Sequence, residues 1–320
     1  MTLIDTDTDT GLPPLDFSVS RNLNAASAAA REEVLANPGF GTRFTDHMID
    51  ICWSVTGGWH RPRVQPYGPL ALPELPVPYF IQSLRELIAV DGDWVPSGTD
   101  QSLYLRPFMF AKEAFLGVRP AHKVGYYVIA SPAGAYFKGG VQPVSIWLSE
   151  DYARAGKGGT GAAKTGGNYA ASLLPQSEAY ENECDQVVFL DADGNVEELG
   201  GMNVVFVRKD GTLVTPQSPS ILEGITRDSI LQLARDRGHR VEGRAVSLAE
   251  WRDGVASGDI VEVFACGTAA VVTPIGTLKG RDFLDEQPSG SLALSLREEL
   301  TDIQYGRRED VHGWLTRLDA

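Results

Sequence analysis

Apolar side chains recur at a helical spacing in several separate stretches of the chain. In the clearest stretch Phe80, Leu84 and Leu87 share one face, which predicts a helix that buries this face. Another predicted helix opens at Ser247, with Glu250 at the spacing of a capping box. The whole pattern predicts helices over residues 24–36, 78–90, 226–238 and 291–303, and from 247 onward.

Strand-forming residues gather in short runs that are separated by turn residues. Asp193-Gly194 and Asp210-Gly211 each lie between two such runs, where they suit β-hairpins. Five prolines between Val64 and Pro78 exclude a helix interior or a central strand. Hairpins combined with separate helices predict an α+β (mixed α/β) fold. The predicted strands are residues 102–111, 123–130, 186–190, 203–208 and 212–214, with a strand-like pattern also over 40–53.

Changes in composition indicate two domains, for which 320 residues suffice. The Asp-, Thr- and Pro-rich start is typical of a flexible tail. Small residues, Pro and Gly from Ser131 to Pro143 are typical of a linker. We expect a flexible tail over 1–20, a small N-terminal domain over 21–132, a linker over 133–143 and a larger C-terminal domain over 144–320.

The chain is acidic, with a formal net charge of −14 at pH 7. Nucleic-acid binding depends on clustered Lys and Arg, so neither that partner nor a membrane is expected. The chain shows no secretory signal pattern and no apolar run long enough to cross a bilayer. Three scattered cysteines, Cys52, Cys184 and Cys266, are expected to be buried thiols in a reducing cytoplasm.

Two lysines and five glycines are concentrated between Lys157 and Tyr169. Glycine-rich backbone can approach a ligand closely, but the Walker spacing of a phosphate loop is absent. A second interpretation is a lysine next to a cofactor, because an amine removed from water deprotonates more readily and can form a Schiff base. From composition alone, a surface loop with solvated lysines is the commoner explanation of such a segment.

Two further segments have both a chemical and a structural interpretation. Glu197 and Glu198 precede a double glycine. One carboxylate could hold a cationic ring nitrogen, or both could lie in a solvated turn. The predicted helix start at Ile225 and Thr226 is either an anion site or an ordinary capped end.

The remaining candidates are a threonine and a tyrosine–arginine pair. Thr268 lies among small residues, which suit either a phosphate contact or a tightly packed turn. Tyr104 and Arg106 would share one face of a strand, where the arginine could bind a substrate carboxylate or form an edge-strand ion pair. The five histidines show no metal-ligand spacing, so no metal site is expected.

The order and wording of these segments resemble the branched-chain amino-acid aminotransferases, which are class IV pyridoxal-phosphate-dependent enzymes. The resemblance covers the chain from about residue 20 to its end. It rests on the segments that begin at Phe40, Tyr104, Lys157, Glu198, Gly224, Gly267 and Leu300, which read FGTRFTDHM, YLRP, KGGTGAAKTGGNY, ELGGMN, GITR, GTA and LTDIQYG.

This resemblance implies the fold-type IV architecture, with a small N-terminal α/β domain and a larger C-terminal domain, and a homodimer. It implies pyridoxal 5'-phosphate bound covalently as a Schiff base by Lys164. Tyr169 would bind the phenolic oxygen of the cofactor, and Glu198 its pyridine nitrogen. The phosphate would be held by Ile225, Thr226 and Thr268, and the substrate pocket would be lined by Phe40, Tyr104, Arg106, Gly201 and Ala269.

The implied activity is amino-group transfer between Leu, Ile or Val and 2-oxoglutarate. The freed lysine amine would move the α-proton as a general acid–base. Two alternatives stay within the fold, namely D-amino-acid transamination and an aminodeoxychorismate lyase. A third is a catalytically impaired or inactive homologue.

Two departures from the family pattern have consequences. Ala270 and Thr273 occupy the positions where some relatives have a Cys-x-x-Cys pair, so no thiol switch is expected. At Leu70–Ala71 the chain lacks a long segment that the family carries, which would include a phosphate-binding arginine and part of the small domain's sheet. Loss of such a charged contact costs on the order of 1.5–3 kcal/mol.

Overall fold

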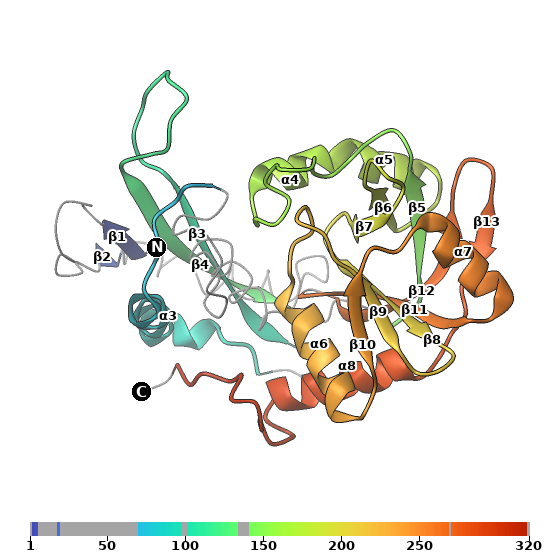
Figure 1. Ribbon diagram of the computed structural model, residues 1–320. Coiled ribbons are helices and arrows are strands. Elements are labelled where there is room, and N and C mark those ends of the chain that lie inside the picture. Colours follow the sequence, from blue (N-terminus) through green and yellow to red (C-terminus); the bar gives the residue numbers. More distant parts are fainter. Residues whose placement is uncertain are drawn as a thin grey trace. The chain divides into compact units, whose positions relative to one another are not determined.

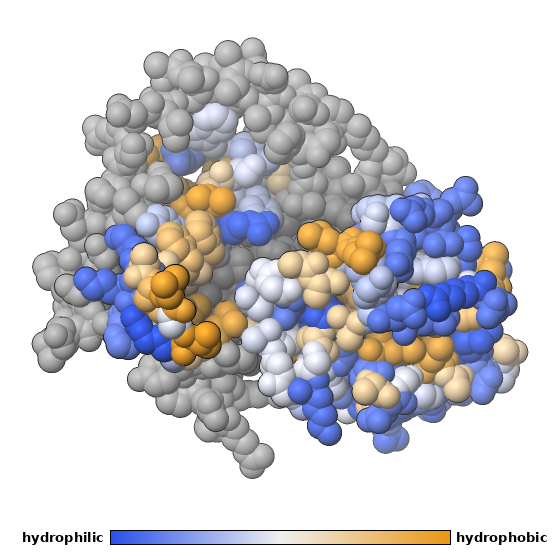
Figure 2. Space-filling view, turned by 90° about the horizontal axis from the view of Figure 1, so that it is seen from above, coloured by the Kyte–Doolittle hydropathy of each residue, from blue (hydrophilic) through white to orange (hydrophobic). Residues whose placement is uncertain are grey.

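The computed structural model describes residues 2–5, 18–19, 70–97, 101–133, 141–268 and 270–318, with side chains from residue 70 onward. The chain forms two compact units (Figure 1). Unit 1 consists of residues 1–138 together with 313–320, and unit 2 of residues 139–312. The division after Lys138 lies within the stretch 133–143 for which the sequence predicts a linker. Hydrophilic residues cover much of the visible face of unit 2 (Figure 2).

Unit 1 contains an antiparallel sheet in the order β2-β1-β4-β3. β3 (Ser102–Ala111) and β4 (Val124–Ala133) confirm the two strands predicted here. β1 (Thr2–Asp5) and β2 (Ser18–Val19) lie within the stretch predicted as a flexible tail, so the prediction missed them. β1 pairs with β4, a distant partner that local composition does not reveal, and β2 pairs with β1.

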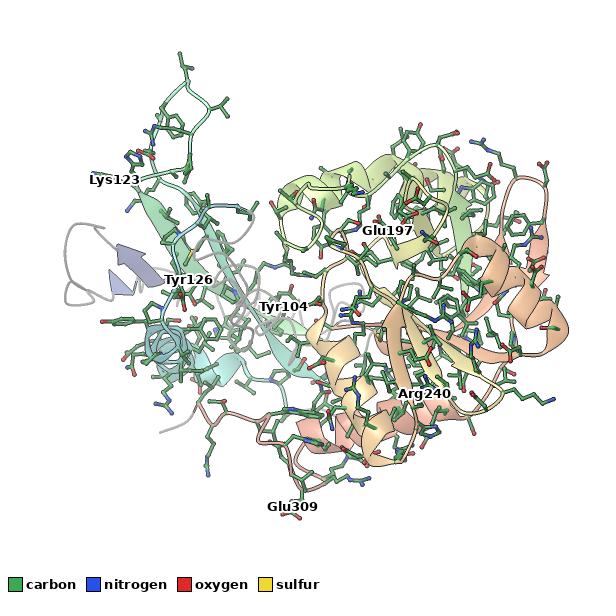
Figure 3. All side chains as sticks on the ribbon, in the orientation of Figure 1. Tyr104, Lys123, Tyr126, Glu197, Arg240 and Glu309 are labelled. Carbon is green, nitrogen blue, oxygen red and sulfur yellow. The ribbon has the colours of Figure 1, made fainter. Side chains whose placement is uncertain are left out.

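The core of unit 1 forms between this sheet and one helix, α3 (Val77–Asp91), which continues into the 3-10 turn η1 (Gly92–Trp94). The predicted helix over 78–90 and its buried face are confirmed. Ser83 on α3 and Tyr126 on β4 add a hydroxyl–hydroxyl hydrogen bond of 3.1 Å (Tyr126 is labelled in Figure 3). The buried apolar contacts come from Phe80, Leu84, Leu87, Leu103, Leu105 and Val128.

Unit 2 is built on a nine-stranded sheet in the order β10-β9-β8-β11-β12-β5-β6-β7, with β13 paired to β12. Three neighbouring pairs, β10–β9, β12–β5 and β5–β6, are parallel. The edge strand β7 turns through Gly200–Gly201 into β8, and the Leu199 N–H donates to the Met202 carbonyl, so the sheet curls. The strands are β5 (Val144–Ser149), β6 (Gln186–Leu190), β7 (Val196–Leu199), β8 (Asn203–Arg208), β9 (Leu213–Pro216), β10 (Val241–Arg244), β11 (Ile260–Gly267), β12 (Val271–Lys279) and β13 (Leu284–Glu286).

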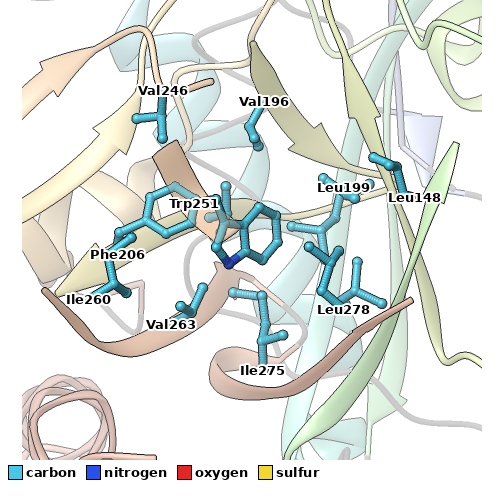
Figure 4. Packing of buried hydrophobic residues seen from close by; sticks show 14 of the residues in the cluster. Leu148, Val196, Leu199, Phe206, Val246, Trp251, Ile260, Val263, Ile275 and Leu278 are labelled. Carbon is cyan, nitrogen blue, oxygen red and sulfur yellow. The ribbon is translucent and has the colours of Figure 1, made fainter. Parts of the chain in front are cut away.

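Helices cover the sheet of unit 2, and α6 and α8 pack side by side (Figure 1). The three helices predicted in this part of the chain are confirmed, including the cap in which Ser247 Oγ accepts from the Glu250 N–H at 3.0 Å. Trp251 is fully buried at the centre of the core, with its ring edge-on to Phe206 (Figure 4). The helices are α4 (Gly166–Ala171), α5 (Leu173–Glu181), α6 (Ile225–Asp236), α7 (Leu248–Ser257) and α8 (Leu292–Gln304).

Some predicted features lie outside the described residues. These are the helix over 24–36, the strand-like stretch 40–53, Cys52, and the site residues Phe40 and Ala269. Cys184 and Cys266 are buried free thiols, as predicted. No helix in the described parts of the chain is both long and apolar enough to span a membrane.

Candidate functional site

Lys164 ends a tightly fixed loop between β5 and α4. Asn168, buried in α4, donates its side-chain amide to the backbone oxygens of Thr160 at 2.8 Å and Ala163 at 2.9 Å. At Gly161 the backbone lies so close to its neighbour that a Cβ would stand 2.1 Å from the Ser220 carbonyl oxygen. Gly161 therefore permits a close approach of two backbone segments.

The two lysines of this segment have different surroundings. Lys164 is half-buried, and its Nζ donates to the phenolic oxygen of Tyr169 at 2.6 Å. Lys157 is exposed. The geometry therefore favours the interpretation of Lys164 as a ligand-directed amine over the solvated-loop interpretation, which fits Lys157.

Glu198 on β7 is buried and forms an ion pair with the equally buried Arg154. The Leu222 N–H donates to the same carboxylate at 3.0 Å. Arg154 Nη2 also donates to the carbonyls of Gly161 at 2.9 Å and Ser220 at 2.8 Å. One arginine thus fixes both the carboxylate and the loop that carries the lysine. Sequence reasoning missed Arg154, because no motif links it to a glutamate so far along the chain.

Burial raises the pKa of Glu198 to about 7. Arg154, the Leu222 N–H, Lys164 and Arg227 lower this pKa, but by less than burial raises it. The amine of Lys164 and the guanidinium of Arg227 therefore lie close enough to act on this carboxyl group. A cationic nitrogen placed beside this carboxyl group would favour its ionised form and pair with it.

The start of β8 lies between the start of α6 and the end of β11. Asn203 pairs with Cys266 of β11, and its side-chain amide donates to the Leu222 carbonyl at 2.9 Å. Its side-chain oxygen would stand only 2.3 Å from a Cβ at Gly224, the N-cap of α6. Asn203 thereby brings the N-terminus of α6 next to the turn that follows Gly267.

Several buried polar atoms around this point have no hydrogen-bond partner. Among the described residues they include Thr268 Oγ1, Arg227 Nε and Arg154 Nε. A buried polar group without a partner is costly, and native proteins seldom leave one without a reason. Thr268 follows β11, and Arg227 lies in the first turn of α6, where the helix dipole favours an anion. The unpartnered atoms indicate a ligand with polar and anionic groups.

The donor set can be tested against a phosphorylated pyridine aldehyde. Its aldehyde and phenolic oxygen are neighbouring ring substituents, and the Lys164 amine and the Tyr169 hydroxyl lie within one hydrogen bond of each other. Glu198 offers a carboxyl group for the ring nitrogen, while Thr268 and the start of α6 offer contacts for a phosphate. The residues present fit this group.

The proposed substrate residues are only partly described. Tyr104 and Arg106 share a face of β3 in unit 1, as predicted, and the guanidinium donates to the tyrosine hydroxyl. Gly201 is exposed in unit 2, and a Cβ added to it would meet nothing within 4 Å. Phe40 and Ala269 lie outside the described residues, so the pocket stays a prediction.

These features suit a pyridoxal-phosphate site on a curled sheet. Residues 71–278 match the family described as "Amino-transferase class IV", and the chain belongs to this family. Enzymes of this class use pyridoxal 5'-phosphate, which is therefore the cofactor of this chain. The predicted fold-type IV architecture is confirmed by its structural relatives.

The relatives described next are all named as branched-chain aminotransferases. The branched-chain-amino-acid aminotransferases of Mycolicibacterium smegmatis and Mycobacterium tuberculosis are 50% and 49% identical, covering 96% and 95% of this chain and 99% and 98% of those proteins. The Escherichia coli branched-chain aminotransferase structure has a TM-score of 0.64 and 29% identity, covering 77% of each chain. The Thermobaculum terrenum branched-chain aminotransferase in its PLP-form has a TM-score of 0.62 and 29% identity, covering 77% of this chain and 76% of that chain.

The alignment with the Mycolicibacterium smegmatis protein is longer than this chain. It extends over 365 residues, whereas this chain has 320. Within the aligned span the relative therefore has residues without a counterpart here. The family match begins at residue 71, directly after the junction noted in the sequence.

Proposed function

We propose that the protein transfers amino groups between branched-chain L-amino acids and 2-oxoglutarate. The observation that carries this proposal is the contact between the Lys164 amine and the Tyr169 hydroxyl beside the buried Glu198, in a chain of the class IV aminotransferase family. The names of its relatives specify branched-chain substrates. They favour this activity over D-amino-acid transamination or a lyase reaction.

Each residue has a distinct task in this proposal. The bound cofactor supplies an electron-withdrawing ring. Lys164 Nζ would take the α-proton of the amino acid and pass it to the cofactor carbon that carried the aldehyde oxygen, and Tyr169 would orient the phenolic oxygen. Glu198 would hold a proton on the ring nitrogen through its ionised carboxylate, since a cationic nitrogen beside the carboxyl group favours the ionised form. The phosphate is held by Ile225, Thr226 and Thr268.

The substrate pocket is proposed to include Phe40, Tyr104, Arg106, Gly201 and Ala269. Arg106 presents an exposed guanidinium whose centre lies 4.9 Å from the Tyr104 ring, an arrangement that orients its planar fork. A fixed fork suits the substrate carboxylate. Gly201 leaves open space where a larger residue would project a side chain.

The test is direct. Purified protein with saturating pyridoxal 5'-phosphate, L-leucine and 2-oxoglutarate is expected to form glutamate and the oxo acid of leucine. D-leucine or aminodeoxychorismate in place of L-leucine is expected to give no product. If either of these compounds is converted and L-leucine is not, the protein has one of the other two activities considered for this fold. The absence of all turnover would favour the inactive homologue.

An internal deletion at Leu70–Ala71 is part of the proposal. It is supported by the excess length of the alignment and by the family match that starts at residue 71. Ala71 has a φ of 51°, in the left-handed region that non-glycine residues seldom adopt. If the missing segment held a phosphate-binding arginine, α6 and Thr268 would hold the phosphate without that charge.

We further propose a cytoplasmic homodimer. Two free buried thiols support a reducing compartment. Leu116 and Val118, between β3 and β4, are fully exposed, and Leu173 and Leu174 of α5 are 70% and 56% exposed. Exposed aliphatic side chains of this kind mark interfaces with other molecules, and a second copy is the simplest partner.

Light scattering after size-exclusion chromatography is expected to give twice the chain mass. A Leu173→Glu/Leu174→Glu variant should shift towards the monomer, because it would bury carboxylates in the interface. The matched control is Val311→Glu, which charges another exposed apolar position of unit 2. A monomeric wild-type protein would contradict the dimer proposal.

A further inference from the structure

The backbone is strained at Val271, the first residue of β12, which follows Thr268 by three positions in the chain. Val271 has a φ of 56°. A β-branched residue fits poorly in the left-handed region, so such a conformation persists only where the surroundings enforce it. Val271 is also buried, so water does not stabilise this conformation.

Arg297 on α8 forms hydrogen bonds with the backbone on both sides of Val271. Arg297 Nη1 donates to the Ala270 carbonyl and, at 3.1 Å, to the Val272 carbonyl. These two oxygens belong to the residues on either side of Val271. Arg297 is only 7% exposed, and hydrogen bonds from a desolvated cation are stronger than those in water.

The helix that supplies this arginine is itself anchored to the neighbouring strand. Glu262 on β11 is buried and accepts hydrogen bonds from the Leu292 N–H at 3.2 Å and the Ala293 N–H at 3.0 Å, at the start of α8. A Cβ at Gly290 would stand 2.3 Å from this carboxylate, so the approach is tight. β11 thus fixes the start of α8, and Arg297 fixes the start of β12 from the next turn of the helix.

We infer that Arg297 is a positioning residue for binding a phosphate monoester, because its bonds to the Ala270 and Val272 carbonyls fix the start of β12, close in the chain to the Thr268 hydroxyl. This inference rests on the proposed role of Thr268 in holding the cofactor phosphate. Arg297 needs no contact with the cofactor. Its effect passes through the backbone carbonyls of Ala270 and Val272.

The test compares two ligands that differ only in the phosphate. The apoprotein is titrated with pyridoxal 5'-phosphate and with pyridoxal, and bound ligand is followed by its absorbance. Arg297→Met is expected to weaken pyridoxal 5'-phosphate binding about 10-fold, comparable with a lost hydrogen bond to a charged group, and to leave pyridoxal binding unchanged. Arg297→Lys, which keeps the cation with fewer donors, should lie between this variant and the wild type.

A second substitution tests the route through the strained residue. Glycine adopts positive φ without strain, so Arg297→Met/Val271→Gly should recover most of the lost affinity. Arg297→Met/Val271→Ala removes the same buried methyl groups but keeps a Cβ, and it should not recover. Arg237→Met is the matched control, because Arg237 bonds Ser295 and Glu299 on α8 but not the start of β12. It should bind both ligands like the wild type.

The outcomes separate this inference from the proposed phosphate site. Thr268→Val should show the same phosphate-specific loss as Arg297→Met, and this agreement with glycine rescue supports the inference. If Thr268→Val shows the loss but Arg297→Met does not, only the role of Arg297 is overturned. Equal weakening of both ligands, or equal weakening by Arg237→Met, also overturns it. If Thr268→Val binds both ligands normally, the phosphate site itself is overturned, and the inference with it.

Discussion

Replacing Lys164 by alanine is expected to abolish amino-group transfer. The substitution removes both the covalent bond to the cofactor and the amine that moves the α-proton. Proton transfer by a positioned group alone contributes roughly 10²–10⁴-fold to the rate, so kcat should fall by at least this factor. The measurement is glutamate formation from L-leucine and 2-oxoglutarate at saturating cofactor.

Lys157→Ala is the control for this experiment. It removes an exposed lysine from the same glycine-rich segment and leaves the Lys164–Tyr169 contact in place. Its kcat should match that of the wild type within about 2-fold, since surface substitutions away from a site seldom have larger effects. A Lys157→Ala protein as impaired as Lys164→Ala would show that the wrong lysine has been chosen.

Breaking the buried pair between Arg154 and Glu198 is expected to have the largest effect on stability. Arg154→Met leaves the Glu198 carboxyl group buried without its cation and releases the carbonyls of Gly161 and Ser220. Removal of one partner of a buried ion pair typically costs about 3–5 kcal/mol. The free energy of unfolding of the apoprotein, measured in urea, should fall by this amount at pH 8.

The double variant Arg154→Met/Glu198→Gln separates the charge effect from lost packing. A neutral amide has no charge to leave unpaired, so the double variant should be more stable than Arg154→Met alone. If the two proteins unfold at the same urea concentration, the ion pair does not contribute in the way described here.

The raised pKa of Glu198 predicts how the stability of the protein depends on pH. Its pKa is about 7 in the folded protein, above its ordinary value of 4.5, so the folded state binds this proton more tightly than the unfolded state. The resulting stabilisation is complete below about pH 4.5 and is lost as the pH rises through about 7, by about 3 kcal/mol in all. Glu198→Gln should flatten this part of the apoprotein's stability profile. An unchanged slope would show that another group titrates there.

Local sequence patterns were sufficient to predict the helices and strands whose own residues show a regular hydrophobic pattern. α3 and α6 each bury a face that is visible as a helical repeat, and β3, β6 and β8 end at the predicted residues. β11 and β12 were missed because they are buried along most of their length, on both faces, so their sequence shows no regular alternation. α4 begins with two glycines, which propensity alone assigns to a loop.

The residues of the candidate site also fall into those with a local sequence signal and those without one. Lys164, Tyr169 and Glu198 stand in recognisable segments, and the structure brings them together within unit 2. Arg154 and Arg297 act through backbone carbonyls that lie far from them in the chain. Such contacts exist only once the strands and helices have packed, so neither arginine has a local signature.

Borohydride reduction followed by peptide mapping tests the central claim most directly. Reduction of the protein with bound pyridoxal 5'-phosphate fixes the lysine–cofactor bond as a stable amine, and mass spectrometry of the digested chain then locates it. The account predicts stoichiometric labelling of the peptide at Lys164 and none at Lys157. Labelling at Lys157, or the absence of a labelled peptide from a protein saturated with cofactor, would contradict it.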